Sequence, residues 1–436
     1  MMSKSALSST ERPSILTFNK STLIVWVAIS VIVSETFAGA LRYYFDQVGV
    51  SPLLYLPKFA CLLFFTLELL RYKATRILWM SLLLLMLSIA LAMLHGASVT
   101  NVAFSLYNFS PLLFGAVCSE HILYRKQLLG RVIVVCMAAS VMGLLLDKFT
   151  TVPWKGYSYM LGNTELAGNT AWAADEFDRL AGFTRVSNAL STLLAVYSLY
   201  MAMFTRSRVM ICIIAAVGFC TIVLTTSKAP AAAFAITLGV MALSRLRWTS
   251  SSVFVVIVAI GLLLPIIGVS FDFDPAKITS GESSLMSLYD RLINTWPNVA
   301  QFLYHQGWSL TGAGVGMFGS SQIMFPVPGA AILSGSDSSV MYLWGTFGII
   351  GIGLYILQIP MFFILRDRPS RMDNALLAIS VFICVTSWTT DMFEITLSNL
   401  LMGIAIGRAL AGSPSAAAVT TKAQGLGELS VLPELR

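Results

Sequence analysis

Charged residues are scarce in this sequence: Asp, Glu, Lys and Arg together make up 11% of the 436 residues. Soluble domains carry roughly 25% charged residues, so this chain lacks the polar surface that a water-soluble protein needs. Hydrophobic residues make up 57% of the chain, and its mean hydropathy is +0.79. This composition excludes two or three soluble domains and predicts that most of the chain lies within a lipid bilayer.

Patterns for disulfides and metal sites are also missing. The six cysteines fall within or at the ends of apolar runs, no polar loop contains a pair, and no C-x-x-C motif occurs. These spacings exclude a disulfide framework and a cysteine metal site. The three histidines, His95, His121 and His305, are scattered along the chain. We therefore expect neither a bound metal nor another cofactor.

Twelve apolar runs predict membrane-spanning helices, each of which needs about 20 residues to cross a bilayer. We therefore expect an all-α polytopic membrane protein with about twelve transmembrane helices in a domain covering residues 22–411. A polar cytoplasmic tail at 1–21 precedes this domain, and a flexible cytoplasmic tail at 412–436 follows it. The first run has no small-residue cleavage site after a short core, so we interpret it as a retained span. The runs are 22–41, 52–70, 77–94, 101–118, 132–147, 186–204, 209–225, 229–243, 252–270, 338–365, 375–390 and 395–410.

The distribution of basic residues predicts the orientation of the chain, because cytoplasmic loops are enriched in Lys and Arg. With the N-terminus in the cytoplasm, 19 of the 28 Lys and Arg residues fall on the cytoplasmic side, 8 fall on the opposite side, and Lys58 lies inside a span. We therefore expect both termini in the cytoplasm. Two long loops, at about 147–185 and 271–337, are then external.

The first external loop ends in a pair of arginines, Arg179 and Arg185, directly before a span. Guanidinium groups bind phosphate through forked hydrogen bonds, so this pair is typical of a phosphate or pyrophosphate site. The alternative is that both arginines pair with the nearby acidic residues Asp175, Glu176 and Asp178.

The second external loop contains an amphipathic stretch, SLMSLYDRLINTWPNVAQFLYHQGW, whose apolar residues recur at helical spacing. We expect a helix in the membrane interface with a kink or restart at Pro297. Arg291 flanks the apolar stripe and can face a lipid-linked phosphate, or alternatively snorkel to the headgroups. His305 is a candidate proton shuttle, with a hydrogen-bonded structural histidine as the alternative.

Asp337 stands at the start of the apolar run 338–365. A carboxylate there, near external arginines, can act as the general base for a sugar hydroxyl, and it can also cap the following helix. The upstream glycines Gly312, Gly314 and Gly316 follow no predicted strand, so they do not form a dinucleotide motif and instead predict a tight loop.

Further candidate residues lie in the external loops and near the ends of the spans. Trp172 and Trp308 offer flat surfaces on which sugar rings can stack, although interfacial belts use the same residues. Glu35 and Lys58 are expected at one depth on neighbouring helices, where they would form an ion pair or share a cavity. Lys228, at the outer end of a short helical hairpin, is expected to point towards the same external site.

Four segments in order resemble the O-antigen ligase and Wzy-type polysaccharide polymerase superfamily, over roughly residues 179–365. They are RLAGFTRVSNALSTLLA, LTTSKAPAAAFAI, DRLINTWPNVAQFLYHQGWSLTGAGVGMFG and SDSSVMYLWGTFGIIGIGLYI. The resemblance implies a fold similar to membrane-embedded, GT-C-like glycosyltransferases. It also implies a metal-independent enzyme on the periplasmic face of the bacterial inner membrane that joins undecaprenyl-pyrophosphate-linked oligosaccharides. In such an enzyme, Arg179 or Arg185, Lys228 and Arg291 would hold the pyrophosphate.

Two departures from the family pattern bear on the function. Ser227-Lys228-Ala229 replaces the frequent Ser-Arg-Gly, so this position offers a point charge and not a guanidinium fork. Asp337 stands where ligases carry a histidine, which favours a polymerase, most like an exopolysaccharide polymerase of the xanthan kind.

We therefore expect polymerisation of lipid-linked repeat units into an exopolysaccharide or O-antigen-like chain. One alternative is a ligase that transfers glycan to the lipid A core, and another is a transporter, or flippase, for the lipid-linked oligosaccharide. The middle of the membrane domain is sparse in charge and shows no matching halves, which favours an enzyme over a transporter. The expected partners are the lipid-linked oligosaccharide, membrane lipids, a flippase and a chain-length regulator, and nucleic acid is not among them.

Overall fold

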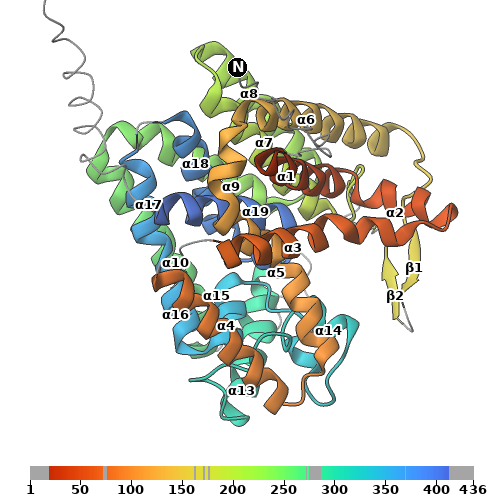
Figure 1. Cartoon of the computed structure of the whole chain (residues 1–436), viewed down its shortest axis with the longest axis vertical. Coiled ribbons are helices and arrows are strands. Elements are labelled where there is room, and N and C mark those ends of the chain that lie inside the picture. Colours follow the sequence, from red (N-terminus) through yellow and green to blue (C-terminus); the bar gives the residue numbers. More distant parts are fainter. Residues whose placement is uncertain are drawn as a thin grey trace, which may run out of the picture.

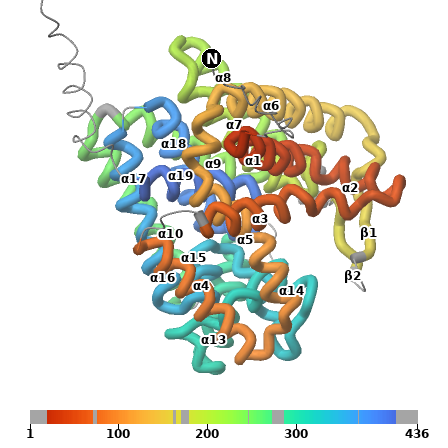
Figure 2. Tube along the Cα trace, viewed as in Figure 1, coloured from red at the N-terminus to blue at the C-terminus, as the bar shows by residue number. Residues whose placement is uncertain are grey.

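The computed structural model describes residues 19–71, 76–161, 164–169, 172–174, 177–271, 273, 286–368 and 370–411. Apart from positions 19–21, the two expected tails lie outside these described residues. Figure 1 shows a body built almost entirely of helices, with small β-hairpins at one edge. Figure 2 shows that α4, α13, α14, α15 and α16 lie together in one half of the molecule, whereas α1, α6, α7 and α8 lie in the other.

The elements before residue 271 include most of the long helices and both hairpins. The strands β1 and β2 pair antiparallel, as do β3 and β4. The elements are α1 (Lys20–Thr36), α2 (Ala38–Gln47), η1 (Ser51–Tyr55), α3 (Leu56–Arg71), α4 (Arg76–Leu94), α5 (Val99–Tyr124), α6 (Lys126–Phe149), β1 (Ser158–Leu161), β2 (Thr164–Ala167), β3 (Trp172–Ala174), β4 (Phe177–Arg179), α7 (Ser187–Phe204), α8 (Arg208–Leu224), α9 (Lys228–Ala242), η2 (Leu243–Arg245) and α10 (Arg247–Ser270).

The elements after residue 285 are shorter and joined by tighter loops. They are α12 (Met286–Asp290), the π-helical segment η3 (Arg291–Thr295), α13 (Trp296–His305), α14 (Ser320–Met324), η4 (Ala331–Ser334), α15 (Ser339–Phe347), α16 (Ile349–Ile356), α17 (Gln358–Arg366), α18 (Arg371–Thr386), η5 (Met392–Glu394) and α19 (Thr396–Leu410).

Seven helical segments of the described chain are long and apolar enough to cross a membrane, and there are eight if the bent pair α1–α2 counts as one span. The protein is therefore a multi-pass membrane protein, with fewer full-length spans than the twelve we expected. The seven segments are Ser51–Leu70, Arg76–Leu94, Val99–Tyr124, Lys126–Phe149, Ser187–Phe204, Arg247–Ser270 and Ile349–Arg366.

The other predicted runs form helices that are short or broken. The helices α8, α9, α18 and α19 have 17, 15, 16 and 15 residues, less than the roughly 20 needed to span a bilayer without thinning it. The run 338–365 breaks at Gly348, whose φ of 62° ends α15 and begins α16. The run 22–41 bends by 87° between α1 and α2.

This bend is caused by a contact with a loop that is distant in sequence. The backbone N–H groups of Gly39 and Ala40 donate to the carbonyl oxygen of Phe183 (2.8 and 3.1 Å), in the loop before α7. A Cβ atom on Gly39 would lie 2.9 Å from the carbonyl carbon of Thr184. The loop therefore crosses directly over the start of α2, and only glycine allows this close approach.

The centre of the fold is the contact between α5 and α19, the most extensive helix pair in the structure. Gly115 of α5 faces the backbone of α19, where a Cβ atom would lie 2.5 Å from the carbonyl oxygen of Leu400. Gly403 and Gly407 of α19 make the reciprocal close approach to Leu112 and Ala116. Small residues at the contact let the two helix backbones approach closely. Membrane helices depend on such close packing, because in lipid the hydrophobic effect does not drive helices together.

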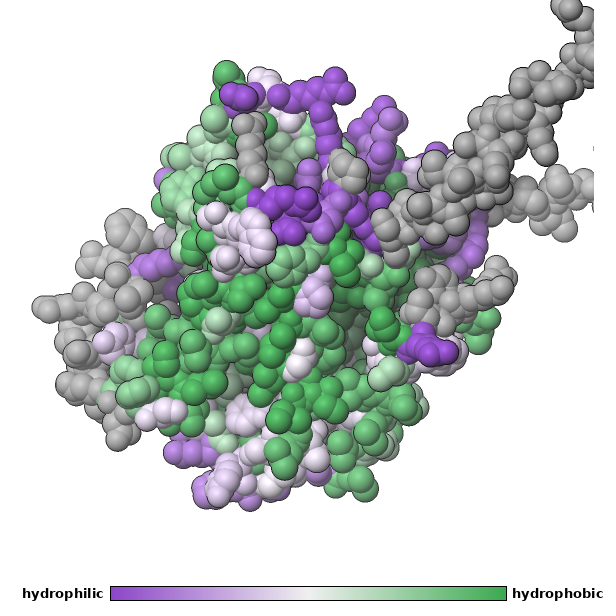
Figure 3. All heavy atoms as spheres, turned by 90° about the vertical axis from the view of Figure 1, so that its left-hand side faces the viewer, coloured by the Kyte–Doolittle hydropathy of each residue, from purple (hydrophilic) through white to green (hydrophobic). Residues whose placement is uncertain are grey.

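The surface that faces outward from α10, α16 and α17 is strongly apolar. Exposed side chains there include Val256 and Leu263 of α10, Ile350 of α16 and Ile364 of α17. Figure 3, which views the side on the left of Figure 1, shows a broad apolar surface with hydrophilic residues concentrated at one end. A monomer in water rarely exposes an apolar patch of this kind, so this surface supports burial in lipid.

Candidate functional site

Arg291 and Asp337, which the sequence places in the same external loop, lie in direct contact. The Nε atom of Arg291 donates a hydrogen bond to Oδ2 of Asp337 (3.2 Å), and their side chains are 19% and 52% exposed. Nη1 of Arg291 also donates to the carbonyl oxygen of Ser287 (3.1 Å), which orients the guanidinium. Arg291 is the first residue of the π-helical segment η3, and such segments often occur at functional sites.

The helix that carries Arg291 is held against the protein body. The apolar stripe Leu292, Trp296, Val299 and Leu303 is buried, and Leu292 lies close to Gly268 of α10. The apolar stripe therefore packs against the protein body, where Gly268 allows a close approach, and a position of this helix in the membrane interface stays a prediction. The expected irregularity near Pro297 is confirmed, since the π-helical segment ends two residues before it, at Thr295.

Two hydrogen bonds fix the segment that contains Asp337, and one of them runs from the hydroxyl of Ser336 to the carbonyl oxygen of Ser338 (3.2 Å). The indole Nε1 of Trp296 donates to the carbonyl oxygen of Ser336 (3.1 Å). Asp337 itself has a φ of 47°, in the left-handed region that aspartate tolerates better than most residues. Ser338 occupies the N-cap position of α15, so the alternative role of Asp337 as that cap is not observed. The carboxylate is directed to Arg291 instead.

Two further carboxyl groups, Asp391 and Glu394, lie in the segment between α18 and α19. The hydroxyl of Ser339 donates to the carbonyl oxygen of Thr390 (3.2 Å) and accepts from the N–H of Met392 (2.9 Å), which joins this segment to the start of α15. Burial raises the pKa of Asp391 well above its ordinary value, and the negative charges of Glu394 and Asp337 raise it further.

The pKa of Glu394 is also raised, by burial, although its hydrogen bond from Ser320 and the charge of Lys58 oppose the shift. Asp391 and Glu394 are electrostatically coupled, so they gain and lose protons as a pair. Carboxyl groups whose pKa is raised in this way bind protons more readily than free carboxylates, which is a property of general bases in several enzymes.

A chain of hydrogen bonds leads from this carboxyl pair to Lys58 of α3. The hydroxyl of Ser320 donates to Glu394, Nδ2 of Asn108 donates to Oγ of Ser320 (2.9 Å), and Nζ of Lys58 donates to Oδ1 of Asn108 (3.4 Å). The Lys58 ammonium also lies 5.0 Å from the centre of the Tyr107 ring. The sequence analysis singled out Lys58 but missed Asn108, Ser320 and the roles of Asp391 and Glu394.

The expected proximity of Glu35 and Lys58 is confirmed in part. The two groups interact electrostatically, and Lys58 interacts in the same way with Glu394 and Arg185. Among the described residues, however, no ion pair joins Glu35 to Lys58, whose hydrogen bond goes to Asn108. Lys58 therefore belongs to the polar network around Glu394.

The two arginines of the first long loop, which we predict to be external, differ in their surroundings. Arg185 is exposed, donates from Nη2 to the carbonyl oxygen of Ala167 (2.9 Å), and interacts electrostatically with Lys58. Arg179 ends β4, and its buried Nε atom has no hydrogen-bond partner within the described part of the chain. Of the three alternative partners of both arginines, Asp175 and Glu176 lie outside the described residues, and so does the side chain of Asp178 in β4.

Lys228 and His305 are exposed at helix ends. Lys228 is the first residue of α9 and follows Thr226, which has a left-handed φ of 60°. His305 ends α13, and its ring contacts that of Tyr304. No described residue forms a hydrogen bond with His305, so the alternative of a hydrogen-bonded structural histidine has no support here. The proposed roles of both residues stay predictions.

The two predicted sugar-stacking residues lie in different settings. Trp308 is half-buried and stacks on His95, with 4.2 Å between the ring centres. Nδ1 of His95 is hydrogen-bonded to the carbonyl oxygen of Ala313 (3.0 Å), so one face of the indole ring is covered by a fixed side chain. Trp172 begins β3, and its side chain lies outside the described part of the structure.

The predicted tight glycine loop is confirmed, and it leads directly to Ser320. Gly312, Gly314 and Gly316 all have positive φ. A Cβ atom on Gly314 would lie 2.5 Å from the carbonyl oxygen of Ser88 in α4. The loop therefore passes between helices at backbone contact distance and positions Ser320 beside Glu394.

The first external loop is anchored to α2 by a group of aromatic residues. The Arg42 guanidinium lies over the rings of Tyr159 and Tyr55 (4.4 and 5.0 Å), and its buried Nε atom has no hydrogen-bond partner among the described residues. The hydroxyl of Tyr157 donates to Asp46. Partial burial and this carboxylate raise the pKa of Tyr157 to about 12, so it remains a hydrogen-bond donor at neutral pH.

No protein-family model and no curated protein sequence matches this chain. The functional argument therefore depends on the site itself.

Proposed function

We propose that this protein is a glycosyltransferase that polymerises undecaprenyl-pyrophosphate-linked oligosaccharide repeat units into an exopolysaccharide or O-antigen-like chain. The observation that carries the proposal is the contact between Arg291 and Asp337, beside the carboxyl pair Asp391 and Glu394. This reaction needs a cation that binds the diphosphate and, next to it, a base that accepts the proton of a sugar hydroxyl. Both must lie near the membrane surface, because the lipid tail of the donor stays in the bilayer.

The topology is part of the proposal. The chain would cross the bacterial inner membrane twelve times, with the shorter helices α8, α9, α18 and α19 included, and both termini would be cytoplasmic. The asymmetric distribution of Lys and Arg supports this orientation. The Arg291–Asp337 pair and the carboxyl pair are then periplasmic, where polymerisation of lipid-linked units would take place.

In the proposed donor site, basic side chains hold the pyrophosphate. Arg291 exchanges its contact with Asp337 for a phosphate oxygen, and Arg185 and Lys58 add positive charge to the same region. Arg179 and Lys228 complete the set expected from the sequence. These cations stabilise the negative charge that accumulates on the diphosphate as it leaves, which is usually the largest contribution to catalysis of such a step.

In the proposed transfer, the acceptor hydroxyl oxygen attacks the anomeric carbon of the donor. A new glycosidic bond forms as the bond from that carbon to the diphosphate oxygen breaks, and undecaprenyl pyrophosphate departs. Asp337 accepts the hydroxyl proton, with His305 as the second candidate from the sequence and the Asp391–Glu394 pair as a third from the structure. Trp172 and Trp308 would bind sugar rings. A single displacement inverts the anomeric centre, and the activated donor bond supplies the driving force.

The direct test uses purified full-length protein and lipid-linked repeat units in detergent. We expect a ladder of elongated glycans with the wild-type protein and a severe loss with Arg179→Ala, Arg185→Ala and Arg291→Ala tested one at a time. If all three variants insert into the membrane and still give polymer of normal yield and length, the proposed site is wrong.

Deletion of the gene separates the proposed function from its alternatives. A polymerase deletion accumulates single lipid-linked repeat units. A ligase deletion accumulates fully polymerised lipid-linked chains instead. Movement of the lipid-linked oligosaccharide across vesicles without new glycosidic bonds would identify a transporter.

A further inference from the structure

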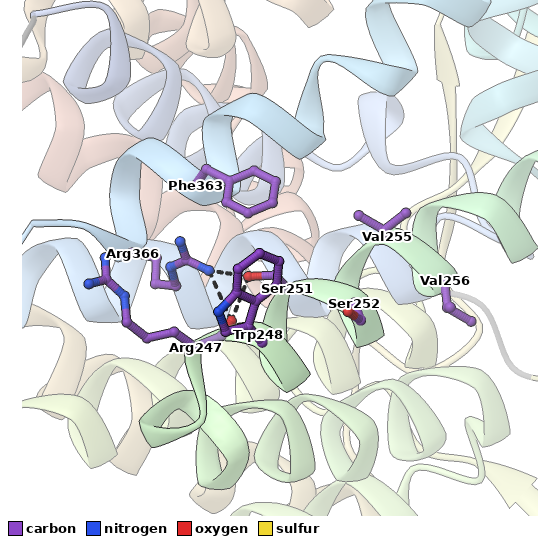
Figure 4. A pocket seen from close by; sticks show the side chains of 8 residues that line it. All are labelled: Arg247, Trp248, Ser251, Ser252, Val255, Val256, Phe363 and Arg366. Atoms are coloured by element: carbon purple, nitrogen blue, oxygen red, sulfur yellow. Dashed lines mark hydrogen bonds between the residues drawn. The ribbon is translucent and has the colours of Figure 1, made fainter.

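A pocket of about 650 Å³ lies between the first turns of α10 and the end of α17. It is at the opposite end of α10 from Gly268, which packs against Leu292 in the segment that carries Arg291. In Figure 4, the two arginines lie at one end of this pocket and the two valines at the other. The pocket is lined by Arg247, Trp248, Ser251, Ser252, Val255, Val256, Phe363 and Arg366.

The polar end of the pocket has an excess of positive charge. A single oxygen of Asp367, Oδ1, accepts hydrogen bonds from Nη2 of Arg247 (2.6 Å) and from Nε and Nη2 of Arg366 (3.3 and 3.2 Å). Hydrogen bonds from Arg247 and then Arg366 lower the pKa of Asp367, so its carboxylate is charged at neutral pH. Two guanidinium groups facing one carboxylate leave a net charge of +1, which one phosphodiester would neutralise.

The two arginines have different degrees of freedom. Arg366 is 14% exposed, donates from Nη1 to Ser251 and to the carbonyl oxygen of Arg247 (3.2 Å), and lies 4.9 Å from the centre of the Phe363 ring. Arg247 is 68% exposed, and within the described part of the chain only its Nη2 atom has a hydrogen-bond partner. Arg366 is therefore a fixed cation, and Arg247 can turn towards a ligand.

The apolar end of the pocket is a stripe along α10. Trp248, Ser252, Val255 and Val256 follow helical spacing on one face of the helix, and Trp248 is 89% exposed. At a rise of 1.5 Å per residue, the stripe is about 12 Å long. This length is close to half of the roughly 30 Å hydrocarbon core, which is the depth of one leaflet.

The position of the pocket matches a membrane boundary. Arg247 begins one apolar span and Arg366 ends another, so the charged end lies at the water side and the valines lie in the hydrocarbon. A tryptophan at this depth is typical of the interfacial belt. The distribution of basic residues predicts that this boundary is the cytoplasmic one.

We propose that this pocket binds one anionic glycerophospholipid of the inner leaflet, with the phosphodiester on Arg247 and Arg366 and an acyl chain along the Trp248–Val256 face of α10. The selectivity follows from charge. Phosphatidylglycerol has a net charge of −1 and neutralises the pocket, whereas phosphatidylethanolamine is neutral overall and brings an amine to an already positive site. This inference does not depend on the proposed glycosyltransferase activity.

Native mass spectrometry of detergent-purified full-length protein, supplied with equal amounts of the two phospholipids, tests the proposal. We expect the wild-type protein to retain phosphatidylglycerol preferentially and Arg247→Gln to weaken this binding roughly fivefold, the contribution of one arginine near a lipid surface. Asp367→Asn removes the competing carboxylate, so it should strengthen binding by a similar factor. The matched control is Arg208→Gln, an exposed arginine at the start of α8 outside the pocket, which should leave binding unchanged.

Each other outcome overturns the proposal. Equal retention of the two lipids by the wild-type protein would remove the selectivity, and an equal loss in Arg208→Gln would assign it to general surface charge. Displacement of phosphatidylglycerol by excess inorganic phosphate would identify a site for free anions. Should Arg247→Gln fail to fold, unchanged binding in Asp367→Asn would still refute the role of the charge cluster.

Discussion

Replacement of Arg291 by alanine tests the proposed catalytic site most directly. The side chain makes one ion pair with Asp337 and donates two hydrogen bonds to Ser287, one to its carbonyl oxygen and one to its hydroxyl. If these contacts were its purpose, Arg291 would be a structural residue. If it holds the donor pyrophosphate, the same substitution removes a cation from the group that leaves.

The two roles differ in magnitude. An ion pair with one partner half-exposed contributes about 0.2 to 1 kcal/mol, and each hydrogen bond to Ser287 contributes about 1 kcal/mol. The Arg291→Ala protein should therefore lose at most about 3 kcal/mol of stability and still insert and fold. Removal of one cationic donor from a transition state costs about 100-fold to 1000-fold in rate. Arg291→Lys should fall between the wild-type and alanine proteins, because lysine keeps the charge but loses the fork.

The assay is the length and yield of polymer in a deletion strain that expresses each variant, with the amount of membrane-inserted protein measured alongside. Arg208→Ala, at the predicted cytoplasmic face, is the control and should behave as wild type. A double variant with Asp337→Asn adds a second criterion. If Arg291 acts only by orienting Asp337, the double variant will be no worse than Asp337→Asn alone. Normal polymer from correctly inserted Arg291→Ala protein would refute the pyrophosphate site.

Three further predictions address the carboxyl pair, the glycine loop and the topology. Glu394→Gln should insert normally but lose about 100-fold to 10,000-fold in polymerisation rate if the pair supplies the base. Because burial raises the pKa of Glu394, the wild-type rate should also begin to fall, as the pH decreases, at a pH above the usual carboxyl range near 4. A rate that stays constant down to pH 4 would contradict this role. Gly314→Ala should destabilise the protein by about 2 to 6 kcal/mol, through backbone strain and overpacking against Ser88. This loss should appear as a lower melting temperature in detergent. Gly353→Ala, the control, should not lower the melting temperature, because the space around its Cβ position is open. The topology can be tested with single cysteines in a background without native cysteines, in cells whose outer membrane alone is permeabilised. A cysteine in place of the exposed Tyr304 should react with a membrane-impermeant maleimide, and a cysteine in place of Arg208 should not. The reverse pattern would invert the proposed topology.

The positions of the helices follow largely from hydropathy, but the number of spans does not. Each predicted run overlaps a helix, because apolar residues in lipid must satisfy their backbone hydrogen bonds within the segment. The breaks come from contacts that are distant in sequence. The bend after α1 depends on hydrogen bonds from Gly39 to Phe183, and the division of the run 338–365 depends on the backbone conformation of Gly348.

From the sequence, only charged residues of the candidate site could be predicted. Arg291 and Asp337 attracted notice because charged residues are rare in this chain, and they prove to be in contact. Asn108 and Ser320 carry no charge and resemble many polar residues in apolar helices. Asn108 and Ser320 are 212 residues apart in the sequence, and Ser320 and Glu394 are 74 residues apart. No local sequence pattern reveals hydrogen bonds between positions so far apart.

The observed contacts divide the site into a fixed part and an adaptable part. Asp337 and the carboxyl pair lie on segments tied together through Trp296, Ser339 and Ser320. Arg185, in contrast, is exposed on a loop. Under the proposed function this division has a purpose: the proton acceptor must meet every acceptor hydroxyl in the same geometry, since preorganisation is what lowers the barrier. Arg185, however, would bind a diphosphate on an incoming lipid and then release it, which an exposed side chain permits.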